Sequence, residues 1–120
     1  MTFDDFVTFI RTSDLERSHE FYTDRLGLEL VLDQGRCRIY RVSKSGFLGV
    51  CEGEPSPDGV IVTLVSRDVR ERCAELAARG VIFDKQVSYN RDFDITHAFL
   101  RDPDGHLIEI QRFESSDWPG

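Results

Sequence analysis

The chain has 120 residues, of which 40% are hydrophobic and 31% are charged, a composition typical of one globular domain. Fifteen Lys and Arg against 22 Asp and Glu give a formal net charge of -7. This acidic balance argues against general binding to nucleic acid or to an anionic membrane, because both need a basic face. No apolar run approaches the roughly 20 residues that cross a bilayer, and we expect no signal peptide at the acidic N-terminus.

The three cysteines, Cys37, Cys51 and Cys73, are odd in number and contain no Cys-x-x-Cys pair. A disulfide framework or a structural zinc site is therefore not expected. We expect all three to be buried as small apolar residues in a reduced, cytoplasmic protein.

The first half of the chain predicts one strand, one helix and three further strands. The β-rich run at residues 6–10 precedes a helix from Asp14 to Gly27. Ser13 stands three residues before Glu16, the spacing of a helix-capping pair, and Gly27 ends the apolar periodicity. Three extended segments follow, at residues 29–33, 36–43 and 47–52.

The second half repeats this pattern. A strand at residues 60–65 precedes a predicted helix that begins at Asp68 and ends at Gly80. Glu71, three residues after Asp68, strengthens the signal for the helix start. Turn residues at 44–46 and 102–105 join the last two strands of each half as hairpins. The extended segments of the second half are expected at residues 81–83, 97–101 and 107–112.

Matching distances between these signals indicate an internal duplication. Asp14 and Asp68 are 54 residues apart, and Gly27 and Gly80 are 53 apart. We expect one α+β domain, residues 1–120, built from two βαβββ modules. The modules span about 3–52 and 60–113, with a linker at 53–59. Because a four-stranded sheet with one helix is marginal alone, we expect the two to form a concave mixed sheet with a helix on each convex face and a ligand cavity within.

Several sequence stretches resemble the vicinal oxygen chelate superfamily. They are TSDLERS (12–18), FY (21–22), LGL (26–28) and FLRDPDGHLIEI (99–110). This superfamily contains glyoxalases, bleomycin-resistance proteins, fosfomycin-resistance transferases and extradiol dioxygenases. The resemblance implies paired βαβββ modules, commonly a homodimer. In its enzymes it implies one divalent metal, held by His or carboxylate ligands from the first and last strands of the modules.

Carried onto this sequence, the metal-ligand positions that the resemblance implies fall on Val7, Ile61, Val50 and Glu109. Val7 and Ile61 lie seven residues before Asp14 and Asp68, and Val50 and Glu109 lie four residues after the hairpin glycines Gly46 and Gly105. Only Glu109 is a residue type that binds metals. We therefore expect the four-ligand site to be absent, with Glu109 as the one candidate ligand. The cofactor is either none or a divalent metal.

Glu109 and His97 form the best acid/base pair in the sequence. Strand alternation and the hairpin at 102–105 bring His97 and Phe99 toward Leu107 and Glu109. Glu109 is either a relic ligand, a general base, a counter-charge for a cation or a carboxylate bonded to a neighbour. His97 is either catalytic or a satisfied structural residue. We name both as candidate catalytic residues.

The remaining candidate positions suggest a mainly apolar pocket, which binds organic molecules by burial and orients them by a few polar groups. Arg11 could bind an anionic group or pair with Asp14 or Glu109 at the surface. Glu52 is either a displaced carboxylate or exposed, and His106 is expected to face water. A core filled by side chains, without a cavity, is the alternative. The candidate ligand-binding residues are Val7, Phe9, Arg11, Val50, Glu52, Ile61, Thr63 and Phe99.

Three functional hypotheses follow. The leading one is a metal-independent binder of a small organic molecule, favoured to be cationic by the negative net charge, or a divergent enzyme of the same fold. The second is a metal-dependent lyase, isomerase or dioxygenase whose ligands have moved, for example to His97, Glu109 and Glu52. The third is a structural or regulatory dimer with a vestigial cavity.

Overall fold

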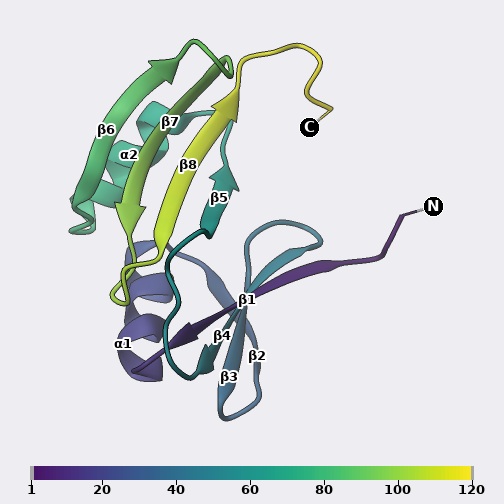
Figure 1. Cartoon of the computed structure of the whole chain (residues 1–120), viewed down its shortest axis with the longest axis vertical. Helices are drawn as coiled ribbons and strands as arrows, with labels where there is room; N and C mark the ends of the chain where they lie inside the picture. Colours follow the sequence, from purple (N-terminus) through teal and green to yellow (C-terminus); the bar gives the residue numbers. More distant parts are fainter. Residues whose placement is uncertain (1, 120) are drawn as a thin grey trace. The chain divides into compact units, whose positions relative to one another are not determined.

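The computed structural model describes residues 2–119 and divides into two compact units, one ending at Asp58 and the other beginning at Gly59. Each unit has the predicted order β-α-β-β-β (Figure 1). The first contains β1 (Phe6–Thr12), α1 (Leu15–Glu20), the π-helical turn η1 (Phe21–Arg25), β2 (Glu29–Asp33), β3 (Cys37–Arg41) and β4 (Gly46–Glu52). The second contains β5 (Ile61–Val65), α2 (Val69–Ala78), β6 (Phe83–Asn90), β7 (Ile95–Arg101) and β8 (Leu107–Phe113).

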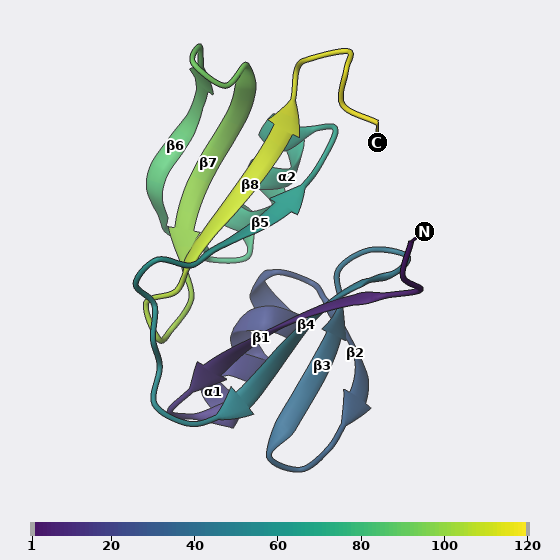
Figure 2. The same ribbon diagram turned by 45° about the vertical axis from the view of Figure 1, so that its right-hand side comes forward.

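The first sheet has the strand order β1-β4-β3-β2. The first strand β1 pairs in parallel with β4, and β3 pairs antiparallel with both β4 and β2. The helix α1 lies on one face of this sheet (Figure 2). Alternation along the strands places Ile10, Tyr40 and Leu48 on the helix-covered face, where all three are buried. The opposite, helix-free face carries Val7, Phe9 and Arg11 of β1, Cys37 and Ile39 of β3, and Gly49 and Cys51 of β4.

The second sheet repeats this arrangement with the order β5-β8-β7-β6, and α2 packs on one face. Cys73 and Leu76 of α2 are buried, as are Ile108 and Ile110 of β8 on the helix-covered face. The helix-free face of this sheet carries Ile61, Thr63 and Val65 of β5, Glu109 and Gln111 of β8, and His97 and Phe99 of β7. The predicted α+β class is therefore confirmed, with two βαβββ units that each have a mixed four-stranded sheet and a helix on one face.

Both helices begin at an aspartate. The Asp14 carboxylate accepts from the backbone N–H of Arg17 at 3.1 Å, and the Asp68 carboxylate accepts from that of Glu71 at 3.1 Å. These bonds satisfy backbone donors that the first turn leaves free. The cap of the first helix is therefore Asp14, one residue later than the expected Ser13.

The strand β6 differs most from prediction, because the sequence predicted extended structure only at residues 81–83. The observed strand continues to Asn90 through a polar stretch. It lies at the edge of its sheet, where one row of backbone groups and much of the side-chain surface meet solvent. An edge strand therefore lacks the hydrophobic alternation that identifies a half-buried one.

The expectation of three reduced cysteines is wrong for two of them, since Cys37 and Cys51 form a disulfide between β3 and β4. Their Cα atoms are 4.0 Å apart because the two residues are direct partners in the antiparallel register. Cys73 is a buried free cysteine, as expected. Within residues 2–119, no helix has the length and apolar character to cross a membrane.

Candidate functional site

Glu109 is the central residue of a polar cluster on the helix-free face of the second sheet. It lies on β8 between Thr63 of β5 and Phe99 of β7, its direct partners in the two strand pairings. Only 7% of its surface is exposed. A buried carboxylate is costly unless hydrogen bonds compensate its lost hydration, so its partners define the chemistry of the site.

Three side chains surround the Glu109 carboxylate. His97 Nδ1 lies 2.6 Å from Oε2, and the Thr63 hydroxyl donates to Oε1 at 2.8 Å. The Gln111 amide, oriented with its nitrogen toward Glu109, donates to Oε1 at 2.9 Å and to Oε2 at 2.8 Å. Both carboxylate oxygens are therefore engaged. Thr63, Glu109, His97 and Gln111 are called the Glu109 cluster below.

His97 supplies the one unsatisfied polar atom of the Glu109 cluster. Because an ionised carboxylate only accepts hydrogen bonds, Nδ1 must carry the proton that His97 shares with Glu109. The other ring nitrogen, Nε2, is buried and has no hydrogen-bond partner among the described residues. In the neutral imidazole this atom is an acceptor. Buried polar atoms normally find a partner, so Nε2 marks a position that a water molecule or a ligand group would satisfy.

Apolar side chains adjoin the Glu109 cluster. The Phe99 ring lies against the His97 imidazole in an edge arrangement, with 4.9 Å between the ring centroids. On β5, Ile61 and Val65 flank Thr63 on the same face, and 54% and 50% of their surfaces are exposed. The site therefore combines a few converging polar groups with exposed apolar surface, the usual composition of a small-molecule site.

The placement of Val50 at the candidate site is wrong. Val50 is 1% exposed and lies with Ile10 and Leu48 on the helix-covered face of the first sheet. The register shows why, because Phe47 of the first unit corresponds to Leu107 of the second (107 minus 47 is 60). Counted the same way, the counterpart of Gly105 is Ser45 rather than Gly46, and the counterpart of Glu109 is Gly49.

In the first sheet, Gly49 is at the position equivalent to Glu109, and the ring of its strand partner Phe9 fills the space where a side chain would lie. The Phe9 ring lies directly over Gly49, where a Cβ would overlap the ring. Phe9 is on the predicted, helix-free face and is 56% exposed. The first sheet therefore presents an aromatic ring where the second presents a carboxylate.

The other candidate residues of the first unit are at its surface. Val7 lies on the helix-free face and is 37% exposed. Arg11 is exposed on the same face, and its aliphatic carbons pack beside Gly53. Glu52 is exposed at the end of β4, where its carboxylate is 3.5 Å from Arg36.

The metal positions that the resemblance implies do not fit a divalent ion. The side chains of Val7 and Ile61 have no atom that can bind a metal. Neither Val50 nor Gly49, the residue that the register makes equivalent to Glu109, provides one. Glu109 alone remains, and His97 bonds to it through Nδ1 rather than standing apart as a second ligand. Three or four N/O donors are needed to hold such an ion, so we derive no chemistry through a metal at these positions.

A different set of residues, Asp102, Asp104 and His106, could hold a metal. One donor atom from each lies within 4.8 Å of the others. In the present arrangement the Asp102 carboxylate accepts from the backbone N–H groups of Asp104 at 3.0 Å and His106 at 2.8 Å. It also lies 2.9 Å from His106 Nδ1. These bonds shape the β7–β8 turn, and His106, expected to face water, is instead 2% exposed.

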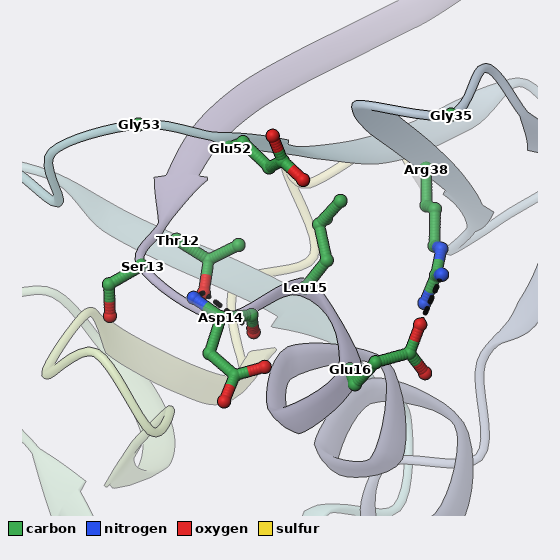
Figure 3. Close-up of a pocket in the computed structure, with 9 residues that line it drawn as sticks. All are labelled: Thr12, Ser13, Asp14, Leu15, Glu16, Gly35, Arg38, Glu52 and Gly53. Carbon is green, nitrogen blue, oxygen red and sulfur yellow. Dashed lines mark hydrogen bonds and ion pairs between the residues drawn. The ribbon is translucent and has the colours of Figure 1, made fainter.

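A separate pocket of about 520 Å³ lies in the first unit, between the end of β1, the start of α1, the start of β3 and the end of β4 (Figure 3). Asp14, Glu16 and Glu52 line it together with Arg38, whose guanidinium donates to Glu16 at 2.6 Å. This hydrogen bond holds the pKa of Glu16 below its usual value, and the nearby Arg38 charge acts in the same direction.

Gln111 is the site residue that the sequence did not predict. It lies two residues after Glu109 on β8, so the alternation that placed Glu109 on the helix-free face also applied to Gln111. An amide is a weaker functional signal than a carboxylate or an imidazole. Its role depends on the pairing of Gln111 with His97 across β7 and β8.

Comparison with known proteins supports the fold. A probable lactoylglutathione lyase from Vibrio cholerae is 27% identical over 86% of this chain and 86% of its own length. Glyoxalase I from Saccharomyces cerevisiae is 29% identical over 93% of this chain, which spans 46% of the yeast protein's length. A crystal structure of a glyoxalase/bleomycin resistance protein/dioxygenase from Nocardioides has a TM-score of 0.79 at 20% identity, covering 100% of this chain and 89% of that one.

Residues 3–110 match the sequence pattern of one family across nearly the whole chain. The two βαβββ units and the structural likeness agree with that match. The chain belongs to the Glyoxalase/Bleomycin resistance protein/Dioxygenase superfamily.

Proposed function

We propose that this chain binds a small organic molecule on the helix-free face of the second sheet without a metal ion. The observation that supports the proposal best is His97 Nε2, a buried acceptor without a partner beside a fully engaged carboxylate. A ligand that carries an N–H or O–H group would satisfy it. Glu109 fixes the ring through Nδ1 and would stabilise positive charge on the imidazole or on the ligand.

The surroundings of the Glu109 cluster favour an aromatic amine or another flat, cationic molecule. The net charge of -7 attracts cations over a distance, and the buried Glu109 carboxylate is a local negative charge. Ile61 and Val65 offer apolar surface that a flat ligand would remove from water. Because Nε2 is covered, ligand binding requires a small displacement of a neighbouring side chain, and Phe99 is the ring in contact with His97.

The same arrangement supports a divergent enzyme that transfers protons without a metal. Glu109 would orient the imidazole, and His97 Nε2 would accept a proton from a bound substrate. An oriented His–carboxylate pair is a common form of general base. The metal-free binder and the metal-free enzyme both require binding of a small organic molecule, so binding is the property to test first.

The test is calorimetric titration of the full chain with a panel of aromatic amines in buffer that contains EDTA. We expect binding by at least one member, and we expect Glu109→Gln to weaken it about tenfold or more, equivalent to about 1.4 kcal/mol. The matched control is Glu52→Gln, which removes an exposed carboxylate of the first unit and should leave the affinity unchanged. Equal affinity of the Glu109→Gln variant, or stabilisation by divalent metals alone, would contradict the proposal.

A metal-dependent lyase, isomerase or dioxygenase is the second candidate, favoured by the spacing of Asp102, Asp104 and His106. It requires stoichiometric metal after purification without chelator. Elemental analysis of the parent chain and of the Asp104→Asn variant measures this directly. Metal that is present in the parent and lost in the variant would support the second candidate over the first.

The expected homodimer and the expected cytoplasmic location remain predictions. Exposed apolar side chains on the helix-free faces, such as Phe9 and Ile61, favour association with another surface. Light scattering after size-exclusion chromatography would give the mass of the particle. A mass equal to one chain at all concentrations would exclude the dimer.

A further inference from the structure

The Cys37–Cys51 disulfide occupies the helix-free face of the first sheet, at the open end of the β3–β4 hairpin. The two residues are directly opposite each other in the register, with 4.0 Å between their Cα atoms. The native strand pairing therefore brings the two sulfur atoms within bonding range.

Contacts other than this disulfide also hold the hairpin together. Backbone hydrogen bonds flank it, from Gln34 N–H to the Cys37 carbonyl at 2.8 Å and from Glu52 N–H to the Arg36 carbonyl at 2.9 Å. The strand register continues inward through Arg38 opposite Val50. On the helix-covered face of the hairpin, the side chains of Tyr40, Leu48 and Val50 are buried in the core of the first unit. The strands should therefore stay paired when the disulfide is reduced.

The chemical surroundings favour thiol–disulfide exchange. Both cysteines are only half-buried, so a small thiol can reach the sulfur atoms. Arg11 is the register neighbour of Cys51 on β1, on the same helix-free face. Positive charge beside a thiol favours the thiolate, which is the attacking species in exchange.

Cys73 provides an internal contrast. It is buried on α2, and burial raises the pKa of its thiol. A buried thiol of this kind stays protonated and reacts slowly. Cys73 should therefore remain a free thiol across the redox range in which the Cys37–Cys51 pair changes state.

We propose that Cys37 and Cys51 are a reversible redox site that exchanges with low-molecular-mass thiols while the chain stays folded. In the reducing direction, one thiolate attacks a sulfur of the pair and forms a mixed disulfide. A second thiol releases the first as a small-molecule disulfide. Two electrons and two protons pass to the protein, which then holds two thiols. The oxidising direction reverses these steps and consumes one small-molecule disulfide.

We expect the redox state of the two cysteines to change the mobility of the pocket shown in Figure 3. Gly35 and Arg38 flank Cys37 in the sequence, Glu52 and Gly53 directly follow Cys51, and all four residues line that pocket. Reduction removes the covalent tie between these two parts of its wall. The backbone around residues 34–38 and 52–53 should then open more often, although the strands remain paired.

The test uses the full chain equilibrated in buffers from oxidised to reduced glutathione, then acid-quenched, unfolded and alkylated for mass spectrometry. We expect one labelled cysteine at the oxidising end and all three at the reducing end, through a transition that reverses when the buffer is exchanged. Circular dichroism should be unchanged across the series. Three labelled cysteines in every buffer, one in every buffer, or loss of the folded signal on reduction would each overturn the proposal.

Two variants and one further measurement sharpen this test. Cys73→Ser should lower the label counts to none and two without moving the midpoint, and a shifted or absent transition would count against the Cys37–Cys51 pair. Cys37→Ser should leave Cys51 unable to close the bond, so that it carries glutathione at the oxidising end. Hydrogen exchange of residues 34–38 and 52–53 should be several-fold faster in the reduced chain, and equal rates would refute the link to the pocket.

Discussion

The helix-free faces of the two sheets share one backbone frame but carry different chemistry. In the second sheet, Glu109 lies between Thr63 and Phe99, and His97 is opposite Gln111. The corresponding positions of the first sheet hold Gly49 between Phe9 and Ile39, with Cys37 opposite Cys51. A charged cluster in one unit thus corresponds to a glycine, an aromatic ring and a disulfide in the other.

This difference shows how a duplicated unit can specialise without changing its fold. Strand order and register are preserved because they depend on the alternate, helix-covered positions, which are mainly apolar in both units. The helix-free positions contribute less to that core and are free to diverge. Polar groups there must still satisfy one another, which explains why Glu109 is accompanied by three hydrogen-bonding neighbours.

The largest expected effect comes from removing the carboxylate of the second sheet. Glu109→Ala leaves the buried donors of Gln111 and His97 without their acceptor, whereas the exposed Thr63 hydroxyl can bond to water. Each buried donor that loses its partner costs on the order of 1 kcal/mol or more, so we expect the free energy of unfolding to fall by about 2–3 kcal/mol. Urea titration followed by circular dichroism measures this change.

The matched control for that prediction is Glu52→Ala in the first unit. Glu52 is exposed and paired only at 3.5 Å with Arg36, so its loss should change stability by less than about 0.5 kcal/mol. Equal stability of the Glu109→Ala variant and the parent would show that the Glu109 cluster is not the organised, buried network described above.

The second prediction concerns the corresponding glycine of the first sheet. A Cβ at Gly49 would overlap the Phe9 ring, so Gly49→Ala must turn that ring outward. Because Phe9 is already 56% exposed, we expect a moderate loss of about 1–2 kcal/mol. In a Phe9→Ala background the same substitution should cost much less, and a double-mutant cycle measures the difference. Additive effects would mean that the ring does not exclude side chains from position 49.

Most of the fold could be predicted from the sequence because its signals are local. The aspartates that cap the helices, the stop glycines and the apolar alternation of β5 and β8 each act within a few residues. The polar edge strand β6 lacked such a signal. It also adds residues to the second unit, which is why equivalent positions are 54 apart in β1 and β5 but 60 apart in β4 and β8.

The candidate site was only partly predictable, because its contacts depend on exact register. Counting from the hairpin glycines made Val50 the equivalent of Glu109 in the first unit. The observed strand pairing shows that the equivalent residue is Gly49. The contact between His97 and Glu109 was accessible to hairpin reasoning, since the β7–β8 turn is short. The pairing of Cys37 with Cys51 was not, because their spacing of 14 residues forms no recognised motif.

The smallest expected effects distinguish the starts of the two helices. The Arg38 hydrogen bond lowers the pKa of Glu16, whereas a side-chain hydrogen bond with Asp68 raises the pKa of Glu71. The Glu16 contribution to stability is therefore present above the ordinary glutamate pKa and lost as the pH falls through the lowered value. The Glu71 contribution is present below the ordinary value and lost as the pH rises through the raised one.

Opposite responses to pH should follow from neutralising each glutamate. Glu16→Gln should destabilise the chain near pH 7 and lose this effect once the pH falls below the lowered pKa of Glu16, whereas Glu71→Gln should stabilise it near pH 7 and have little effect below the ordinary glutamate pKa. Both changes should be small, because both carboxylates are exposed, and both should shrink in high salt. Urea titrations of the two variants and the parent across this range measure them. If both variants changed the free energy of unfolding in the same direction, the two helix starts would not differ electrostatically. The electrostatic difference between the units would then be confined to the Glu109 cluster.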